Sequence, residues 1–482
     1  MALEKAQVDA AVNAVTALFP KQIVQAPSAT FKESQEGYWN TIQRRKLPAC
    51  FFQPTTVAEV QQGLVEVVKA GCPFAIKSGG HSSNPEGSSV EGGFQFDLRN
   101  LNHVEVSDDR MRVRVGPGMR WGDLYLQLER QGLTAVGGRD FGVGVAGFVF
   151  GGGISYFSTK HGWGIDNLES VDIVLANGHL VVTSAESHRD LFKALRGGGA
   201  HNFGIVTSLT LKVHPYNGFW GGRNVVAEEH FDELFRAYDQ YTRDLVKDVN
   251  AHMIVDFFRH DGRMVAVQFM GYTEPVANPT IYDRICAIPS VDRTLRLADH
   301  SNLAAEMAEV TDSRGKRNAY WTLAMGYDIN LLRSVYNVWA KITAPFSDRL
   351  RFALDVNHIT PAMRIKAARE GRENVYGLED LDVTMTLVLL TAVWEKESDD
   401  DEVNLILKRL YHAIESLTRE FGHSHSFRYM NYAHHEQDVI AGFGDANKLF
   451  LLEVAARYDP EGIFQHLQRG GFKLSPSKRA RM

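Results

Sequence analysis

The chain has 482 residues, of which 44% are hydrophobic and 23% charged, and it carries a formal net charge of -6. Because single cores stop growing at roughly 250 to 300 residues, we expect more than one domain. The acidic balance argues against nucleic acid or an anionic membrane as a partner, since both select clustered Lys and Arg. The only basic cluster, Lys478, Arg479 and Arg481, is interpreted as a solvated tail.

Three cysteines, Cys50, Cys72 and Cys286, are too widely spaced for a disulfide framework or a zinc site, although one disulfide stays possible. The opening segment places Glu4 and Lys5 where a secretory signal needs an unbroken apolar core. No later stretch reaches the roughly 18 apolar residues of a membrane span. We therefore expect a cytoplasmic protein, or a secreted one if a signal has been removed, and the oligomeric state stays open.

The first part of the chain mixes helices and strands. Residues 55–71 predict a helix with a capping box from Thr56 to Glu59 and a stop at Gly71. Further elements are expected in chain order: a buried strand at 73–77, a strand at 111–115, a helix closed by Gly132, a hairpin across Asn177-Gly178, a helix at 189–196 and a strand ended by Pro215. This pattern indicates one α+β unit.

From about residue 217 to 425 the sequence pattern changes. Long segments in which apolar and polar residues alternate predict strands. One hairpin turns at Asp261-Gly262, and another strand covers 382–394. Helices are expected between these strands, at 229–247, 330–342 and 401–420. The pattern predicts a second, cap-like domain built on an antiparallel sheet.

Glycines gather in turns that suit a phosphate. The segments 78–83 and 137–153 allow backbone N–H groups to approach an anion without an intervening Cβ, and serine hydroxyls add donors. A third group, 197–199, is followed by Asn202 and Gly204. Three such groups, one of them around His81, indicate a long, bent ligand lying against the backbone rather than ordinary tight turns.

One motif misleads. Gly142, Gly144 and Gly147 satisfy the dinucleotide pattern G-x-G-x-x-G, and Asp166 follows at a suitable distance. A Rossmann turn opens a sustained amphipathic helix, whereas here three residues lead directly into another glycine run at 151–153. We therefore do not expect a Rossmann domain.

The order of several segments matches a known family. They are SGGHS (78–82), GVGVAGFVFGGGISYFSTKHGWGIDN (142–167), VDIVLANG (171–178), LFKALRGGGAHNFGIVTSLTLKV (191–213), YMNY (429–432) and YDPEGIF (458–464). From about residue 45 to 474 the chain resembles the fungal berberine-bridge-enzyme-like FAD-linked oxidases of the vanillyl-alcohol oxidase superfamily. The likeness covers nearly the whole chain.

The resemblance implies an α+β fold with a two-lobed FAD-binding domain of the p-cresol-methylhydroxylase (PCMH) type and a substrate domain whose antiparallel sheet is flanked by helices. The expected divisions are an N-terminal helical segment (1–45), the FAD-binding domain (46–216), the substrate domain (217–425) and a C-terminal segment that returns to the flavin (426–482).

The cofactor implied is FAD bonded through its 8α-carbon to His81. A tether of this kind fixes the ring and raises its oxidising power. The other implied cofactor contacts are Ser78, Gly79, Gly80, Ser82, Ser83, Gly138, Gly144, Gly147, Gly152, Asn202, Gly204, Ile205, Val206 and Asn431. Many relatives add a cysteine tether, but the matching place holds Asp140, so we expect His81 to be the sole tether.

Two residues are implied in catalysis. Val143 matches the position that governs the approach of O2, where valine goes with oxidase behaviour and formation of H2O2. Tyr432 matches the family's recurrent base, a role that requires a lowered pKa at neutral pH, and the alternative is a structural aromatic. Asp140 and His161 are further candidates for the base. No metal is expected, because the spacing of His423, His425, His434 and His435 matches no familiar zinc arrangement.

The leading functional hypothesis is an FAD-linked oxidase of a small, largely apolar metabolite with an alcohol, amine or activated C–H group, in secondary metabolism. The alternative is a flavin-scaffolded cyclase with little or no net redox role for FAD. A non-enzymatic flavin-binding protein is a third possibility. The substrate pocket is expected to be built by the 217–425 domain, which carries no recognised motif, so the sequence leaves the substrate open.

Overall fold

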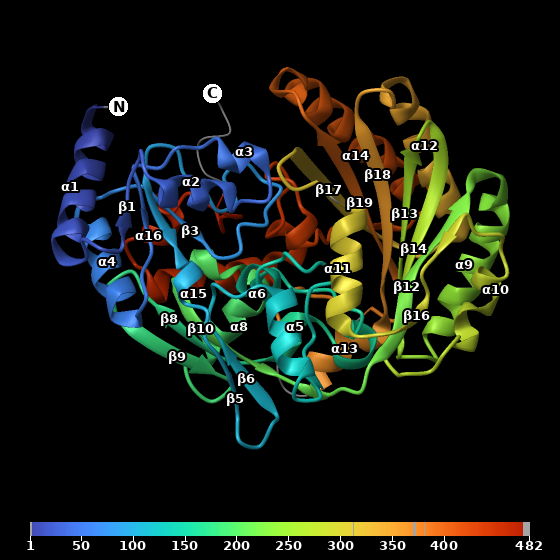
Figure 1. Ribbon diagram of the computed structural model, residues 1–482, viewed down its shortest axis with the longest axis horizontal. Coiled ribbons are helices and arrows are strands. Elements are labelled where there is room, and N and C mark those ends of the chain that lie inside the picture. The colour runs from blue at the N-terminus through green and yellow to red at the C-terminus, as the bar shows by residue number, and fades with distance from the viewer. Residues whose placement is uncertain (1, 312, 370–372, 380, 476–482) are drawn as a thin grey trace.

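The computed structural model describes residues 2–311, 313–369, 373–379 and 381–475, so the predicted basic tail lies outside the described residues. Two lobes lie side by side (Figure 1). One lobe holds both ends of the chain and two small sheets, and the other is built around one large sheet.

The first small sheet has the strand order β1-β2-β4-β3. Its strands are β1 (Ile23–Val24), β2 (Cys50–Phe52), β3 (Phe74–Lys77) and β4 (Phe94–Asp97). The predicted helix at 55–71 is confirmed as α4 (Val57–Lys69), with both capping-box hydrogen bonds between Thr56 and Glu59 present. Apolar side chains of α4, of α1 (Ala2–Leu18) and of the strands share one core.

The second small sheet has the antiparallel order β5-β6-β10-β8-β9. Its strands are β5 (Val104–Val106), β6 (Arg112–Val115), β8 (Leu168–Val174), β9 (Leu180–Ser184) and β10 (Ile205–Lys212). The hairpin predicted at Asn177-Gly178 joins β8 to β9, and Gly178 has the positive φ of 81° that such a turn requires. The predicted helices are α5 (Trp121–Glu129) and α8 (Arg189–Gly198). A further strand pair, β7 (Leu133–Thr134) and β11 (His214–Pro215), stands apart.

The large sheet has nine strands in the order β15-β12-β14-β13-β18-β19-β17-β20, with β16 also paired to β12. Its strands are β12 (Phe219–Ala227), β13 (Ala251–His260), β14 (Arg263–Tyr272), β15 (Asp292–Arg293), β16 (Arg296–Ala298), β17 (Arg317–Gly326), β18 (Arg351–Ile359), β19 (Met385–Trp394) and β20 (Ser424–His425). All pairings are antiparallel, as predicted.

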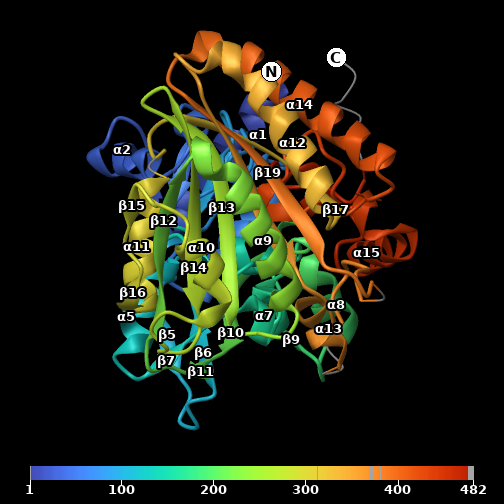
Figure 2. The ribbon, with the colours of Figure 1, turned by 90° about the vertical axis from the view of Figure 1, so that its right-hand side faces the viewer.

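Helices cover the outer face of this sheet (Figure 2). They are α9 (Phe231–Leu245), α12 (Ile329–Thr343) and α14 (Asp400–Glu420), at the three predicted places. Their apolar faces and the strands form a single core rich in aromatic side chains. The opposite face of the sheet is turned toward the other lobe (Figure 1).

The shorter helices are α2 (Ala29–Glu36), α3 (Thr41–Arg44), α6 (Val145–Phe150), α7 (Ser158–His161), α10 (Asp283–Cys286), α11 (His300–Val310), α13 (Pro361–Arg369), α15 (Asp445–Tyr458) and α16 (Ile463–His466). Helix α6 has only six residues, which agrees with the rejection of a Rossmann turn. After the large sheet the chain returns to the first lobe, where α15 contacts α8 and Gln468 bridges to Phe74.

The three cysteines are unbonded in the structure, so none of them forms the single disulfide that the sequence left open. Within the described ranges, every helix is too short or too polar to cross a membrane.

Candidate active site

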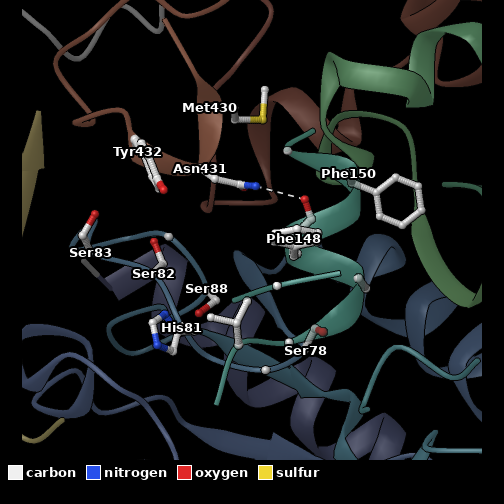
Figure 3. A pocket seen from close by; sticks show the side chains of 18 of the residues that line it. Ser78, His81, Ser82, Ser83, Ser88, Phe148, Phe150, Met430, Asn431 and Tyr432 are labelled. Carbon is white, nitrogen blue, oxygen red and sulfur yellow. Dashed lines mark hydrogen bonds between the residues drawn. The ribbon is translucent and has the colours of Figure 1, made fainter. Parts of the chain in front are cut away.

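A cavity of about 410 Å³ lies where the two lobes meet. Three glycine-bearing stretches of the first lobe line it, at 78–84, 138–151 and 199–206. Strands β13 and β18 of the large sheet and the segment 429–432 line the other side. His81 and the serines lie across the cavity from Tyr432 and Asn431 (Figure 3).

Two of the glycine stretches touch through their main chains. A Cβ on Gly79 would lie 2.4 Å from the Cα of Gly144, so neither position has room for a side chain. Gly147 differs, because it lines the cavity and a Cβ there would meet no atom within 4 Å. The cavity therefore offers bare main chain and open space beside α6, which is the form a cofactor bound against backbone requires.

His81 follows Gly80, whose φ of 66° turns the chain toward the cavity. The imidazole stacks on Trp39, with ring centroids 4.5 Å apart and planes 15° apart, and the backbone N–H of Trp39 donates to the Gly80 carbonyl at 3.0 Å. Burial lowers the pKa of His81. The charge of Asp140 raises this pKa, and the charges of two arginines lower it further. The ring is therefore neutral at pH 7, so one nitrogen has a lone pair available for a covalent bond.

The structure brings most of the predicted residues to this cavity. Those that line it are Ser78, Gly79, Gly80, His81, Ser82, Ser83, Gly138, Val143, Gly144, Gly147, Gly204, Val206, Asn431 and Tyr432. Gly152, Asn202 and Ile205 do not line it. Asn202 instead holds the main chain, donating to the carbonyls of Gly198 (2.8 Å) and Phe472 (2.9 Å), and Ile205 is fully buried in the core. Gly152 makes room for the Tyr376 ring.

The segment that carries Asn431 and Tyr432 is a short 3-10 helix, Met430–Tyr432, held tightly against the first lobe. The Asn431 amide donates to the Phe148 carbonyl at 2.9 Å (Figure 3). The Tyr429 hydroxyl accepts from the backbone N–H groups of Gly153 and Ile154, each at 3.0 Å. Asn431 and Tyr429 thus fix this segment to the glycine run that follows α6.

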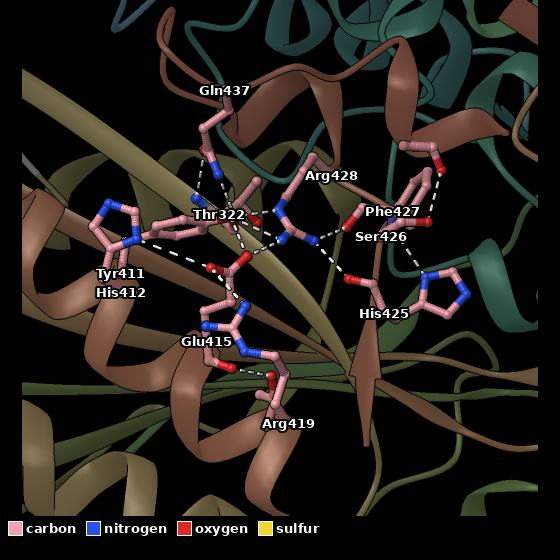
Figure 4. A network of polar contacts seen from close by, with 12 residues as sticks. Thr322, Tyr411, His412, Glu415, Arg419, His425, Ser426, Phe427, Arg428 and Gln437 are labelled. Atoms are coloured by element: carbon pink, nitrogen blue, oxygen red, sulfur yellow. Dashed lines mark hydrogen bonds and ion pairs between the residues drawn. The ribbon is translucent and has the colours of Figure 1, made fainter. Parts of the chain in front are cut away.

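A polar network fixes the same segment to helix α14 and to strand β17 of the large sheet (Figure 4). Arg428 donates to Glu415 of α14 at 3.0 Å and to the Tyr411 hydroxyl at 2.7 Å. Gln437 exchanges two hydrogen bonds with the main chain of Thr322 on β17, at 2.7 and 3.0 Å. Since these anchors flank residues 429–432 on both sides, Tyr432 is held in one position relative to the cavity.

Arg139 was not predicted from the sequence and is the principal cation of the site. Its side chain is 7% exposed and donates to the Tyr432 hydroxyl (2.6 Å), to Asn357 Oδ1 (2.8 Å) and to His252 Nε2 (2.9 Å). These partners lie 293, 218 and 113 residues away in the chain. Only its place in a glycine run expected near the flavin pointed to it.

Tyr432 accepts a hydrogen bond from Arg139, so its own proton is free to point elsewhere. Burial raises the pKa of Tyr432, the charges of Asp355 and Asp256 add to the rise, and Arg139 opposes it. This direction is opposite to the lowering that a tyrosine base needs at neutral pH. At pH 7 the side chain is a neutral phenol that can donate a hydrogen bond into the cavity.

The other candidates for the base occupy different places. Asp140 lines the cavity, and its carboxylate accepts from the Gly142 N–H at 2.7 Å. His161 stacks on His214, with centroids 3.7 Å apart, and does not line the cavity. Two carboxyl groups missed from the sequence, Asp256 and Asp355, do line it.

Among the described residues, one cluster has the spacing of possible metal ligands, formed by His434, His435 and Glu436, whose ligand atoms lie within 4.8 Å of one another. His434 is stacked on Trp321 with centroids 4.5 Å apart. The cluster includes neither His423 nor His425 and is not part of the cavity lining.

Comparison with known proteins agrees with this geometry. Residues 48–184 match the model of the FAD binding domain family. The FAD-dependent monooxygenase tpcD of Cochliobolus heterostrophus is 34% identical over 454 residues, which cover 91% of this chain and 87% of the relative.

Solved structures share the fold at low identity. 6-Hydroxy-D-nicotine oxidase of Arthrobacter nicotinovorans aligns with a TM-score of 0.80 and 18% identity over 94% of this chain and 98% of its own. Xylooligosaccharide oxidase of Myceliophthora thermophila, in complex with xylobiose, aligns with a TM-score of 0.76 and 20% identity over 96% and 99%.

The fold, the glycine-lined cavity and these relatives define an FAD-dependent oxidoreductase. More closely, the chain belongs to the family of the fungal FAD-dependent monooxygenase tpcD, and it shares the fold of berberine bridge enzyme, in agreement with the resemblance found in the sequence.

Proposed function

We propose that the protein is an FAD-linked oxidase of a small, largely apolar metabolite in secondary metabolism. The main observation that supports this function is a single cavity with two different walls. His81 and the glycine turns line one wall, and the hydrogen-bonded Arg139 and Tyr432 face them. Apolar side chains from several elements complete the substrate side: Ile254, Met307, Leu389 and Met430.

His81 is proposed as the sole covalent attachment point of the cofactor. Its support is a neutral, stacked imidazole at the cavity wall, with Asp140 where relatives with a second tether place a cysteine. Ser78, Ser82 and Ser83 of the same turn line the cavity and would hold the cofactor's phosphates together with backbone N–H groups. Asn431 would lie beside the flavin ring.

When bound in this cavity, FAD would supply the hydride acceptor of the proposed reaction. The chain's own residues orient the substrate and handle its proton. Arg139 positions the Tyr432 hydroxyl by a 2.6 Å hydrogen bond, so the phenol O–H is directed at the reacting oxygen or nitrogen of the substrate. The buried surroundings strengthen these polar contacts by excluding water.

Reoxidation by O2 with release of H2O2 is the second half of the proposal. Val143 lines the cavity beside Gly144. We expect a side chain of this size to leave room for O2 to reach the cofactor. The curated relative is named a monooxygenase, and that name describes a different fate for the oxygen atoms.

The test is anaerobic mixing of the purified yellow protein with a panel of alcohols, amines and activated C–H compounds, followed by air. The proposal expects bleaching of the flavin by at least one compound, and then one H2O2 per product formed. With labelled O2, the product should carry no label. Failure of every compound to bleach the flavin would contradict the redox role, and labelled product would identify a monooxygenase.

A further inference from the structure

Two carboxyl groups on the large sheet face the cavity from neighbouring strands. Asp256 of β13 and Asp355 of β18 are directly opposite each other in the antiparallel register, and both line the cavity. Because side chains alternate between the faces of a strand, His252 and Asn357 point the same way two or four residues along. Those are the residues that bind Arg139, so the carboxyl pair belongs to the same polar patch.

Because the two residues are directly opposite on paired strands and share one face of the sheet, their carboxyl groups are neighbours, and each affects the pKa of the other. Two adjacent carboxylates in a poorly solvated place cannot both ionise readily, so they share a proton. Burial raises the pKa of Asp256 to about 7, and burial together with the Asp256 charge raises the pKa of Asp355 well above its usual range. Asp256 Oδ1 is buried and has no hydrogen-bond partner among the described residues, and a proton held within the pair would satisfy it.

Charged and titratable groups of several elements surround the pair. Those whose charge interacts with it are Tyr320 of β17, Arg351 of β18, Tyr432, and Arg139 and Tyr156 from the segments on either side of α6, and His252 lies on the same face of β13. Arg139 lowers the pKa of both carboxyl groups. Its three hydrogen-bond acceptors are themselves uncharged, since burial and Arg139 keep His252 neutral. A pair with one proton, of charge -1, therefore balances Arg139 through space.

We propose that Asp256 and Asp355 together are the proton acceptor of the reaction, and that the substrate's reacting group is a neutral hydroxyl. This inference rests on the proposed function. A hydroxyl can accept a hydrogen bond from Tyr432 while donating its own to the ionised carboxylate. A protonated amine would add a second cation beside Arg139 and would itself need the carboxylate that must act as the base.

The step balances as a two-electron oxidation of an alcohol. The carbon of the CH–OH group loses a hydride to the flavin, and the oxygen loses its proton to the carboxylate as the C–O bond becomes a carbonyl. The pair passes from one bound proton to two and returns the extra proton to solvent after product leaves. Tyr432 stays a neutral donor throughout, consistent with the raised pKa of its hydroxyl.

The first experiment needs no substrate. Infrared spectra of the wild-type holoenzyme, with and without 13C-labelled aspartate, should show the carbonyl band of a protonated, buried carboxyl group at pH 8. The band should vanish in the Asp256→Asn, Asp355→Asn double variant. Absence of the band in the wild-type protein at pH 8 would overturn the proposal, whether or not the variants fold.

The second experiment follows anaerobic bleaching with the best alcohol of the panel across pH 5 to 9. The wild-type rate should rise through about pH 7, because the base works only in its singly protonated form. Asp256→Asn should slow bleaching by roughly 10²- to 10⁴-fold and remove that pH step. Asp261→Asn, at the exposed turn between β13 and β14, is the matched control and should behave as wild type.

The outcomes separate this inference from the proposed function. Bleaching that Asp256→Asn and Asp355→Asn leave within about threefold of wild type would overturn the acceptor role while the redox role stands. A pH step lost in Tyr432→Phe but kept in both aspartate variants would assign the proton to Tyr432 instead. Bleaching by amines only would overturn the hydroxyl assignment, and no bleaching at all would overturn the proposed function itself.

Discussion

The two walls of the cavity are built in different ways. The wall around His81 is mostly main chain, placed by glycines that allow close approach, such as Gly79 against Gly144. The wall around Asp256 and Asp355 is made of side chains that project from neighbouring strands. A main-chain wall fits one invariant ligand, whereas a side-chain wall changes with each substitution. We infer that the first wall defines the cofactor and the second defines the substrate and its chemistry.

The largest expected effect tests the main-chain wall. Gly79→Ala places a Cβ 2.4 Å from the backbone of Gly144, which cannot move aside as a side chain can. We expect destabilisation of about 3 kcal/mol or more and little yellow protein. Gly147→Ala is the matched variant, because its Cβ enters open space. In α6 it should leave the apoprotein as stable or about 0.5 to 1 kcal/mol more stable, yet lower the flavin content.

Thermal unfolding and the flavin-to-protein ratio measure both changes. Equal loss of flavin and stability in Gly79→Ala and Gly147→Ala would show that the second position is only a packing site.

The next effect concerns Arg139, which extends from the glycine-bearing stretch 138–151 to residues of the side-chain wall. Arg139→Met removes three hydrogen bonds and the cation that opposes the raised pKa values of Asp256 and Asp355. Flavin reduction should slow by roughly 10²- to 10³-fold. The midpoint of its pH dependence should move upward, because the carboxyl pair then holds its proton more tightly. Arg139→Lys should restore the midpoint in part, and an unchanged midpoint in Arg139→Met would contradict the coupling.

Tyr432→Phe should have a smaller effect. The variant loses the phenol that donates to the substrate and leaves one Arg139 N–H without its acceptor. We expect flavin reduction to slow by roughly 10- to 10²-fold with the pH step retained. Stopped-flow rates across pH measure this, and loss of the step would return the role of base to Tyr432.

The smallest effect is expected at Val143. Val143→Leu adds one methylene at the cavity wall beside the glycine turn. Reoxidation by O2 should slow by about tenfold, while anaerobic reduction changes little, because the substrate side is untouched. Val106→Leu, in strand β5 and outside the cavity lining, controls for added volume. Equal reoxidation rates in wild type and Val143→Leu would remove the proposed oxygen path.

Much of the main-chain wall could be predicted from the sequence, because its determinants are local. Glycine runs, the capping box at Thr56 and the hairpin at Asn177-Gly178 each act over a few residues. The side-chain wall could not be predicted. Asp256 meets Asp355 only because β13 pairs with β18, and no local pattern sets that pairing.

Arg139 shows the same limit, since its three partners come from three distant parts of the chain. The raised pKa of Tyr432 follows from burial and from the carboxyl pair, which are properties of the assembled sheet. Three residues of the predicted segments do not line the cavity: Gly152, Asn202 and Ile205. The resemblance identifies whole segments, and it does not distinguish residues that line a cavity from those that support it.

The central claim is that FAD is bonded to His81 in this cavity. Acid denaturation of the purified protein tests it most directly, followed by mass analysis of the peptide that contains residue 81. The account predicts that the yellow colour stays with the pellet and that this peptide carries one flavin, whereas His81→Ala releases all its colour. Complete release of colour from the wild-type protein, or a flavin on a different peptide, would contradict the claim.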